Sequence, residues 1–292
     1  MKRIGITAIV AASVLAGPLA RAQPSAPAMK AGEQHEISMR YENAQEGSDG
    51  SSGSSSGGDA ILETVIAVTE SGTELEYDLR PGATPEDRAR DWFFPARILR
   101  QPDGSMRLLN RAELEARLER WLTAAEWSRE VCGRWIFTWN AFRIDCDPEA
   151  VIDTIKAFDL LSADLREGAP YRDSDASEPG LLRRTNGLDG TRFIVSMDVD
   201  PDAVRRERAE ADVTVGEIMQ RPRALDTAMS RRALERISGT IEVTFDVDPD
   251  RKPRRRTRIT RLEIIEPDGV RHTETRVMTV ERRPASSAAS RQ

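Results

Sequence analysis

The last third of the chain carries the pattern that decides the fold class: residues 240–247 read TIEVTFDV, residues 257–265 read TRITRLEII and residues 270–280 read VRHTETRVMTV. Apolar and polar side chains alternate along these runs, which is the period of a half-buried β-strand. Pro267, Asp268 and Gly269 separate the last two runs and are typical of a tight turn. The three runs therefore predict an antiparallel β-meander.

Similar strand pairs and helices precede the meander. We expect β-hairpins from the paired runs 61–69 with 73–79, 93–99 with 106–109, 135–138 with 141–144, and 181–184 with 191–199. Helices are predicted from Thr84, over 110–125, 148–158 and 203–211, and over 225–237, where Ser238 and Gly239 would end the last one. This order gives antiparallel neighbours without parallel crossovers. We expect an α+β fold whose hairpins and C-terminal β-meander form a curved sheet with several helices packed on one face.

Helix caps support three of these assignments. Asn110 and Glu113 have the spacing of a capping box at the start of the helix over 110–125. Asp147 and Asp200 each precede a proline, within the related runs DCDPEAV and DVDPDAV. Alternating carboxylates are also calcium ligands, but an acidic cap before proline is the usual start of a helix. We interpret both aspartates as caps.

Segment composition defines the organisation of the chain. Residues 1–22 have the charged head, apolar run and small-residue end of a signal peptide. We expect a flexible segment over 23–35, a single α+β domain over 36–283 and a disordered tail over 284–292. The Gly- and Ser-rich residues 47–58 predict a flexible loop, and residues 168–180 are the best candidate for an internal boundary.

The signal peptide and the charge together indicate the compartment. No run after the signal peptide reaches the about 20 apolar residues that a membrane-spanning helix needs. The net charge is −6, and cleavage would remove three cations and no acid. An acidic exported chain is a poor candidate for nucleic-acid binding, which requires a basic face. We expect export, to the periplasm first and with full secretion as the alternative.

Cys132 and Cys146 are the only cysteines. A hairpin centred on Trp139 would place them directly opposite each other, at about the Cβ separation that a bridge requires. In an oxidising compartment this predicts a disulfide. A redox or metal-binding pair is the alternative, but the spacing lacks the C-x-x-C pattern and no histidine is near.

The aromatic residues are unevenly distributed. All five tryptophans lie between Trp92 and Trp139. Core packing is the favoured explanation for most of these rings. The alternative is an apolar groove with Trp135, Trp139 and Phe142 near its mouth, because a tryptophan at a hairpin tip is difficult to place in a core.

Basic residues crowd one connection of the meander. They are Arg251, Lys252, Arg254, Arg255, Arg256 and Arg258. A solvated connection that discourages edge-to-edge strand pairing is the favoured interpretation. A patch for an anionic partner is the alternative.

Signatures of catalysis are missing from the sequence. His35 and His272 are the only histidines, and we expect both at the surface. The chain has no nucleophile elbow, zinc-protease or dinucleotide-binding motif. We assign no catalytic, cofactor-binding or metal-ligating residue and expect no cofactor. The prediction is a non-enzymatic envelope protein that binds an apolar ligand or a protein partner. The alternatives are a carboxylate-based envelope hydrolase and an assembly factor that uses the basic residues between Arg251 and Arg258.

Overall fold

The computed structural model describes residues 29–137, 141–187, 190–249 and 252–285. The predicted signal peptide, residues 23–28 and residues 286–292 of the predicted tail lie outside this part. Within it, ten strands form one antiparallel sheet in the order β10-β11-β12-β13-β14-β1-β2-β3-β4-β5. The sheet is open, because its edge strands β10 and β5 do not pair with each other. The fold is broadly α+β and dominated by the sheet.

The strands of the sheet are β1 (Gln34–Gly47), β2 (Ser52–Thr69), β3 (Gly72–Leu79), β4 (Ala96–Arg100), β5 (Met106–Leu108), β10 (Arg183–Gly187), β11 (Gly190–Asp198), β12 (Arg236–Val247), β13 (Pro253–Ile265) and β14 (Arg271–Pro284). Two small ribbons are formed by β6 (Trp135–Phe137) with β7 (Ala141–Arg143) and by β8 (Pro170–Tyr171) with β9 (Gly180–Leu181). The helices are α1 (Pro85–Arg90), α2 (Arg111–Ala124), α3 (Ala150–Ala157), α4 (Pro201–Ile218), α5 (Leu225–Arg232) and the short 3-10 turn Arg129–Val131.

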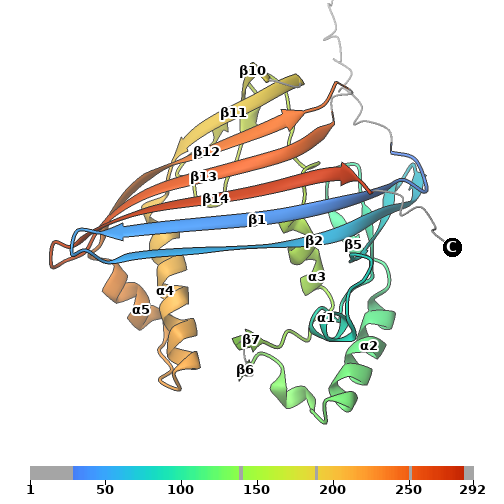
Figure 1. Cartoon of the computed structure of the whole chain (residues 1–292), viewed down its shortest axis with the longest axis horizontal. Coiled ribbons are helices and arrows are strands. Elements are labelled where there is room, and N and C mark those ends of the chain that lie inside the picture. Colours follow the sequence, from blue (N-terminus) through green and yellow to red (C-terminus); the bar gives the residue numbers. More distant parts are fainter. Residues whose placement is uncertain (1–28, 138–140, 188–189, 250–251, 286–292) are drawn as a thin grey trace, which may run out of the picture.

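The helices in the described residues all lie on one side of the sheet, which we call the inner face (Figure 1). They form two groups: α1, α2 and α3 lie toward the side of the sheet that carries β5, and α4 and α5 lie beneath the opposite ends of the long strands, where β11 ends and β12 begins. The outer face of the sheet has no helix over it. This arrangement explains the alternation of the meander, because only one face of each strand is covered.

The inner face carries two hydrophobic cores. The first contains Leu114, Leu118 and Leu122 of α2 and Val151 and Ile155 of α3, packed on inner-face residues of β1 to β5. The second packs Val204 of α4 and Ala169 and Leu182 of the segment around β8 and β9 against inner-face residues of β11 to β13, which include Phe193, Val195, Ile241, Val243 and Phe245. Among the described residues, the two cores have no member in common. The middle of the inner face therefore lies between two separate cores.

The sequence predicts most of these elements correctly. The meander is confirmed as β12, β13 and β14, and the hairpins around 70–72 and 102–104 are confirmed as β2–β3 and β4–β5. Asp200 caps α4 by accepting a hydrogen bond from the Asp202 amide at 2.9 Å. Asp147 caps the turn before α3 instead, because α3 begins at Ala150.

The residue before α2 does not form the capping box that the sequence predicts. Asn110 precedes the helix, but its side chain makes no capping hydrogen bond. Its Oδ1 accepts from the Arg97 amide at 2.9 Å, and its Nδ2 donates to the Pro95 carbonyl at 3.3 Å. Asn110 therefore ties the start of α2 to β4, a tertiary role that the local pattern does not reveal.

The flexible loop expected over 47–58 is wrong. β1 continues to Gly47 and β2 begins at Ser52, so most of the Gly- and Ser-rich segment is strand. Gly57 lies opposite Tyr41 of β1, and a Cβ at Gly57 would lie 2.5 Å from the Tyr41 hydroxyl. The tyrosine ring covers the glycine, which supplies the side-chain packing that glycine lacks. The assignment of residues 36–283 to a single domain stays a prediction.

The helix expected over 225–237 is also wrong in its second half. α5 ends at Arg232, and β12 begins at Arg236. Gly239, which the sequence suggests as a helix stop, lies inside β12 opposite Leu262. A Cβ there would lie 2.2 Å from the Arg261 carbonyl oxygen, so glycine is required by a close approach of β13.

Replacement of Gly239 by alanine should therefore destabilise the fold by about 1–3 kcal/mol, the usual cost of overpacking. Chemical unfolding monitored by circular dichroism measures the change, and Ser238→Ala, at the neighbouring exposed position, is the control. An unchanged midpoint for Gly239→Ala would show that β13 does not approach Gly239 this closely.

Candidate functional site

The predicted disulfide is present. Cys132 and Cys146 are bonded, with 5.5 Å between their Cα atoms. The hairpin has the predicted register, because Trp135 pairs with Arg143 and Ile136 with Phe142. The bridge holds the chain on each side of the β6–β7 hairpin and closes a small loop around it.

The three aromatic residues proposed to line a groove are only partly described. Trp139 lies outside the described residues, and of Phe142 only the backbone in β7 is described. Trp135 is half-buried, and its Nε1 donates a hydrogen bond to Glu217 Oε2 at 3.0 Å. Glu217 belongs to α4. The hairpin therefore joins the two helical groups on the side away from the sheet (Figure 1).

Other tryptophans belong to the first core, as the favoured interpretation holds. Trp92 is buried, and Trp121 and Trp127 pack against the same core. The last two rings meet edge to face, with centroids 5.7 Å apart. Trp135 is thus distinguished from them by its bond to the other helical group.

Between the two cores, the inner face carries a mixed apolar and basic surface that we call the central strip. Its members are Arg258 and Thr260 of β13, Arg276 and Met278 of β14, and Met39 and Tyr41 of β1. Arg258 lies opposite Met278, and Met278 lies opposite Tyr41. Tyr41 is 41% exposed and Met278 is half-buried, and neither belongs to a core. Met39 also packs against the first core, so the apolar area of the strip that lies outside both cores is that of Tyr41 and Met278.

Ion pairs fix the arginines of the central strip. Arg258 donates to Asp173 at 2.8 and 2.9 Å and to Asp175 at 2.6 Å. Arg276 donates to both carboxylate oxygens of Glu207 in α4 at 2.6 and 2.7 Å. Burial alone would raise the pKa of Asp173, but the hydrogen bonds and charge of Arg258 outweigh burial and lower it. The guanidinium groups are therefore held in place on both sides of Met278.

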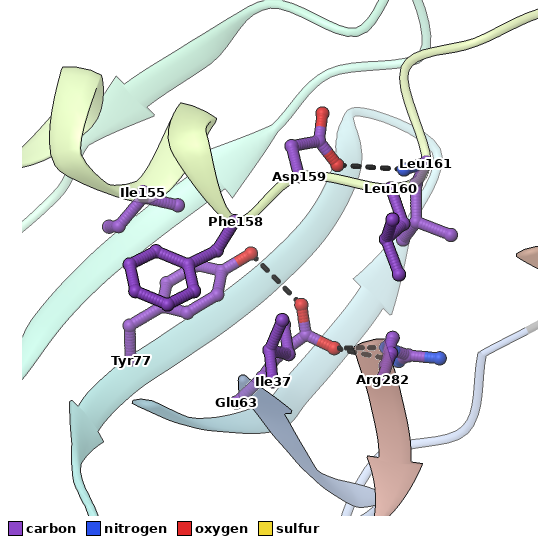
Figure 2. A pocket seen from close by; sticks show the side chains of 9 residues that line it. All are labelled: Ile37, Glu63, Tyr77, Ile155, Phe158, Asp159, Leu160, Leu161 and Arg282. Atoms are coloured by element: carbon purple, nitrogen blue, oxygen red, sulfur yellow. Dashed lines mark hydrogen bonds and ion pairs between the residues drawn. The ribbon is translucent and has the colours of Figure 1, made fainter. Parts of the chain in front are cut away.

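A second polar cluster lies beneath β1, β2 and β14, next to the first core (Figure 2). Arg282 donates to Glu63 Oε1 at 2.6 and 3.0 Å, and the Tyr77 hydroxyl donates to Glu63 Oε2 at 3.0 Å. Asp159 accepts from Arg100 at 2.6 Å and from the Leu161 amide at 2.8 Å. The cavity between these groups measures about 10 Å³, room for about one water molecule.

The groups of this buried cluster bond to one another and stabilise the fold. Burial and the adjacent Glu63 charge raise the pKa of Tyr77 well above its usual range, so its hydroxyl stays a donor. The carboxylates that are buried in the described residues belong to Glu63, Asp159 and Glu235, and each is paired with an arginine. The arginine bonds occupy the oxygens of these carboxylates. A cavity of this size also leaves no room for a sugar ring.

Both histidines differ from the expectation of a surface position. The His35 side chain is 13% exposed, and its Nδ1 accepts a hydrogen bond from Arg282 at 2.9 Å. His272 is equally covered and lies 3.4 Å from Glu266. Each sits in a strand that is paired on both sides, which the sequence near a terminus and a turn does not indicate.

Stability should depend on the protonation of His35. Burial and the Arg282 charge lower the pKa of His35, against the opposing effect of Glu63. The folded protein therefore favours the neutral ring, and stability should fall as the pH drops below the ordinary histidine value of about 6.5. His35→Asn should reduce this loss, measured as thermal midpoints between pH 7.5 and 5. An identical pH profile for the variant would contradict the assignment.

The structure divides the predicted basic patch. Arg256 donates to the Asp159 and Ala157 carbonyls at 3.1 Å, and Arg258 is held in the central strip. Lys252 is half-buried, whereas Arg254 and Arg255 are exposed. Arg251 lies outside the described residues. The residues thus do not form one surface, and Arg254 and Arg255 are the members that face solvent.

A surface depression of about 260 Å³ lies between residues 177–180 and 196–198. Its lining includes Glu178 and Asp198 but no histidine or cysteine. Among the described residues, no group of three or more His, Cys, Asp or Glu side chains is arranged to hold a metal ion. None of the helices in the described part of the chain combines the length and hydropathy needed to span a membrane.

Comparisons with known proteins show no family for this chain. No protein-family model and no curated protein matches it. One solved structure, described as lipid-protein interactions in lipovitellin, is similar at a TM-score of 0.38 and 8% identity. The match covers 89% of this chain and 26% of the lipovitellin chain. A similarity at this level does not indicate a shared function, so the proposed function depends on the geometry of the site alone.

Proposed function

We propose that this chain is an exported binding protein of the cell envelope, and that it holds an apolar or amphipathic molecule against the central strip. The observation that carries the proposal concerns two apolar side chains. Tyr41 and Met278 face the helix side of the sheet but belong to neither core. An apolar surface that a fold leaves unused is a usual sign of a binding site.

The composition of the strip suits such a ligand. Methionine is flexible and polarisable and adapts to apolar molecules of varied shape. Arg258 and Arg276 flank Met278 and are fixed by their carboxylate partners. A few fixed polar groups around an apolar contact are what orient a ligand in most binding sites. The ligand would lie between α4 and the first helical group, with the Trp135 hairpin on the side away from the sheet.

The disulfide supports the exported location, because such bonds persist in oxidising compartments. The residues that would support the two alternatives, a carboxylate-based hydrolase and an assembly factor, are less well placed for those functions. The buried carboxylates are paired with arginines, and the basic patch is divided between solvent and the interior. We therefore favour binding over hydrolysis or assembly.

Native mass spectrometry on protein purified from its own envelope tests the proposal. We expect a bound species of lipid-like mass that organic extraction removes. Met278→Gln should weaken rebinding at least about tenfold, since burial of one methionine is worth about 1.5–3 kcal/mol. Val277→Gln is the matched control, because Val277 is on the same strand but faces the outer side. A clean unliganded mass that does not change with added lipids, or equal loss in both variants, would contradict the proposal.

A further inference from the structure

We propose that the turn between α4 and α5 is a docking surface for an anionic lipid bilayer. The surface, which we call the α4–α5 tip, consists of residues 215–225. It goes beyond the proposed function, because it assigns a second contact site that does not depend on the central strip.

The first observation is a cluster of exposed apolar side chains. Val215 is 52% exposed, Met219 is 59% exposed and Leu225 is 41% exposed. Val215 lies in the last turn of α4 and Met219 is its C-cap, four residues later, so the two side chains lie on the same side of the helix end. Eight large apolar side chains are exposed in the described part of the chain, and three of them lie in this segment. We expect this cluster to bind a partner with an apolar interior.

The second observation is the charge of the same segment. Arg221 and Arg223 are exposed and lie between Met219 and Leu225. The tip contains one acidic residue, Glu217, which accepts a hydrogen bond from Trp135, so the two arginines leave the tip with a net positive charge although the whole chain is acidic. Apolar side chains flanked by arginines match the interface of a bilayer with negatively charged headgroups.

The tip is already ordered and well placed. The Arg221 amide donates to the Gly216 carbonyl at 2.7 Å, and the Gln220 amide donates to the Glu217 carbonyl at 3.0 Å. Arg232 of α5 holds Asp212 of α4 at 2.7 and 2.9 Å. α4 runs away from the sheet, so the tip lies at the end of α4 that is distant from it (Figure 1). Binding would require no ordering of the segment, and the sheet would stay clear of the bilayer.

Vesicle flotation tests the proposal with vesicles of 30% phosphatidylglycerol in phosphatidylcholine and with pure phosphatidylcholine. We expect binding to the anionic vesicles, and weaker binding as salt is raised from 50 to 300 mM, because salt screens exposed charges. The double variant Val215→Ser with Met219→Ser should lower bound protein at least tenfold. Arg221→Gln with Arg223→Gln should lower binding to anionic vesicles and remove its salt dependence.

Matched variants provide the controls. Ile66→Ser with Val68→Ser changes two exposed apolar residues of β2, and Arg183→Gln with Arg184→Gln changes two exposed arginines of β10. Both should bind like the unmodified protein, as should Met278→Gln, which separates this proposal from the ligand site. No binding by the unmodified protein, equal binding to neutral vesicles, or equal loss in the controls would each overturn the proposal.

Discussion

Replacement of Glu63 by glutamine should destabilise the protein by about 3–5 kcal/mol, the usual cost of removing one partner of a buried ion pair. The side chains of Arg282 and Glu63 are 7% and 2% exposed. Without the carboxylate, the Arg282 charge would remain in the interior with no opposite charge bonded to it, and Tyr77 would lose its charged acceptor. Urea unfolding monitored by circular dichroism gives the free energy of unfolding.

An exposed pair on the same strand provides the comparison. Arg283 donates to Glu281 at 2.7 Å, but the arginine is 72% exposed. Glu281→Gln should therefore cost less than about 1 kcal/mol. If the Glu63 and Glu281 variants lose similar amounts, the buried cluster is not the anchor of β1, β2 and β14 that the contacts indicate.

Removal of the disulfide should have the second largest effect. Replacing Cys132 and Cys146 together by alanine should lower the free energy of unfolding by about 3 kcal/mol, the loop-entropy value for a closed loop of this size. The effect should be local at first, because the bridge closes the loop that presents Trp135 to Glu217. Tryptophan fluorescence should report loss of this contact before global unfolding.

Glu217→Gln is the companion variant for the disulfide experiment. It weakens the bond to Trp135 and keeps the bridge, so it should change the fluorescence with little effect on the free energy of unfolding. A double alanine variant that is as stable as the unmodified protein, with the same fluorescence, would show that the bridge does not position the hairpin.

The sequence predicts local structure well where the chain repeats a strand period between clear turns. The meander, the β6–β7 register and the Asp200 cap depend on neighbours in sequence, so propensity and spacing are sufficient. The Gly- and Ser-rich strand and the start of β12 depend on distant partners. Tyr41 covers Gly57, and β13 approaches Gly239, and neither contact leaves a local signal.

The candidate site is predicted only in part, for a related reason. The sequence identifies the disulfide and Trp135, but not the partner of Trp135, because Glu217 is 82 residues away. A signal for the central strip does exist: Arg258 and Thr260 alternate in phase with the buried Leu262 and Ile264. Charged residues at core-facing positions of a strand mark a place where the core is interrupted. The same holds for Glu63 between Ile61 and Val65.

Methionine-methyl NMR tests the central claim most directly. With labelled methyl groups, titration of the delipidated protein with a lipid extract of its envelope should shift the signals of Met278 and Met39, at the central strip. Met197, buried in the second core, and Met106, at the β5 edge, should stay unchanged. Shifts confined to residues outside the strip, or no shift at any lipid concentration, would contradict a ligand held between the two cores.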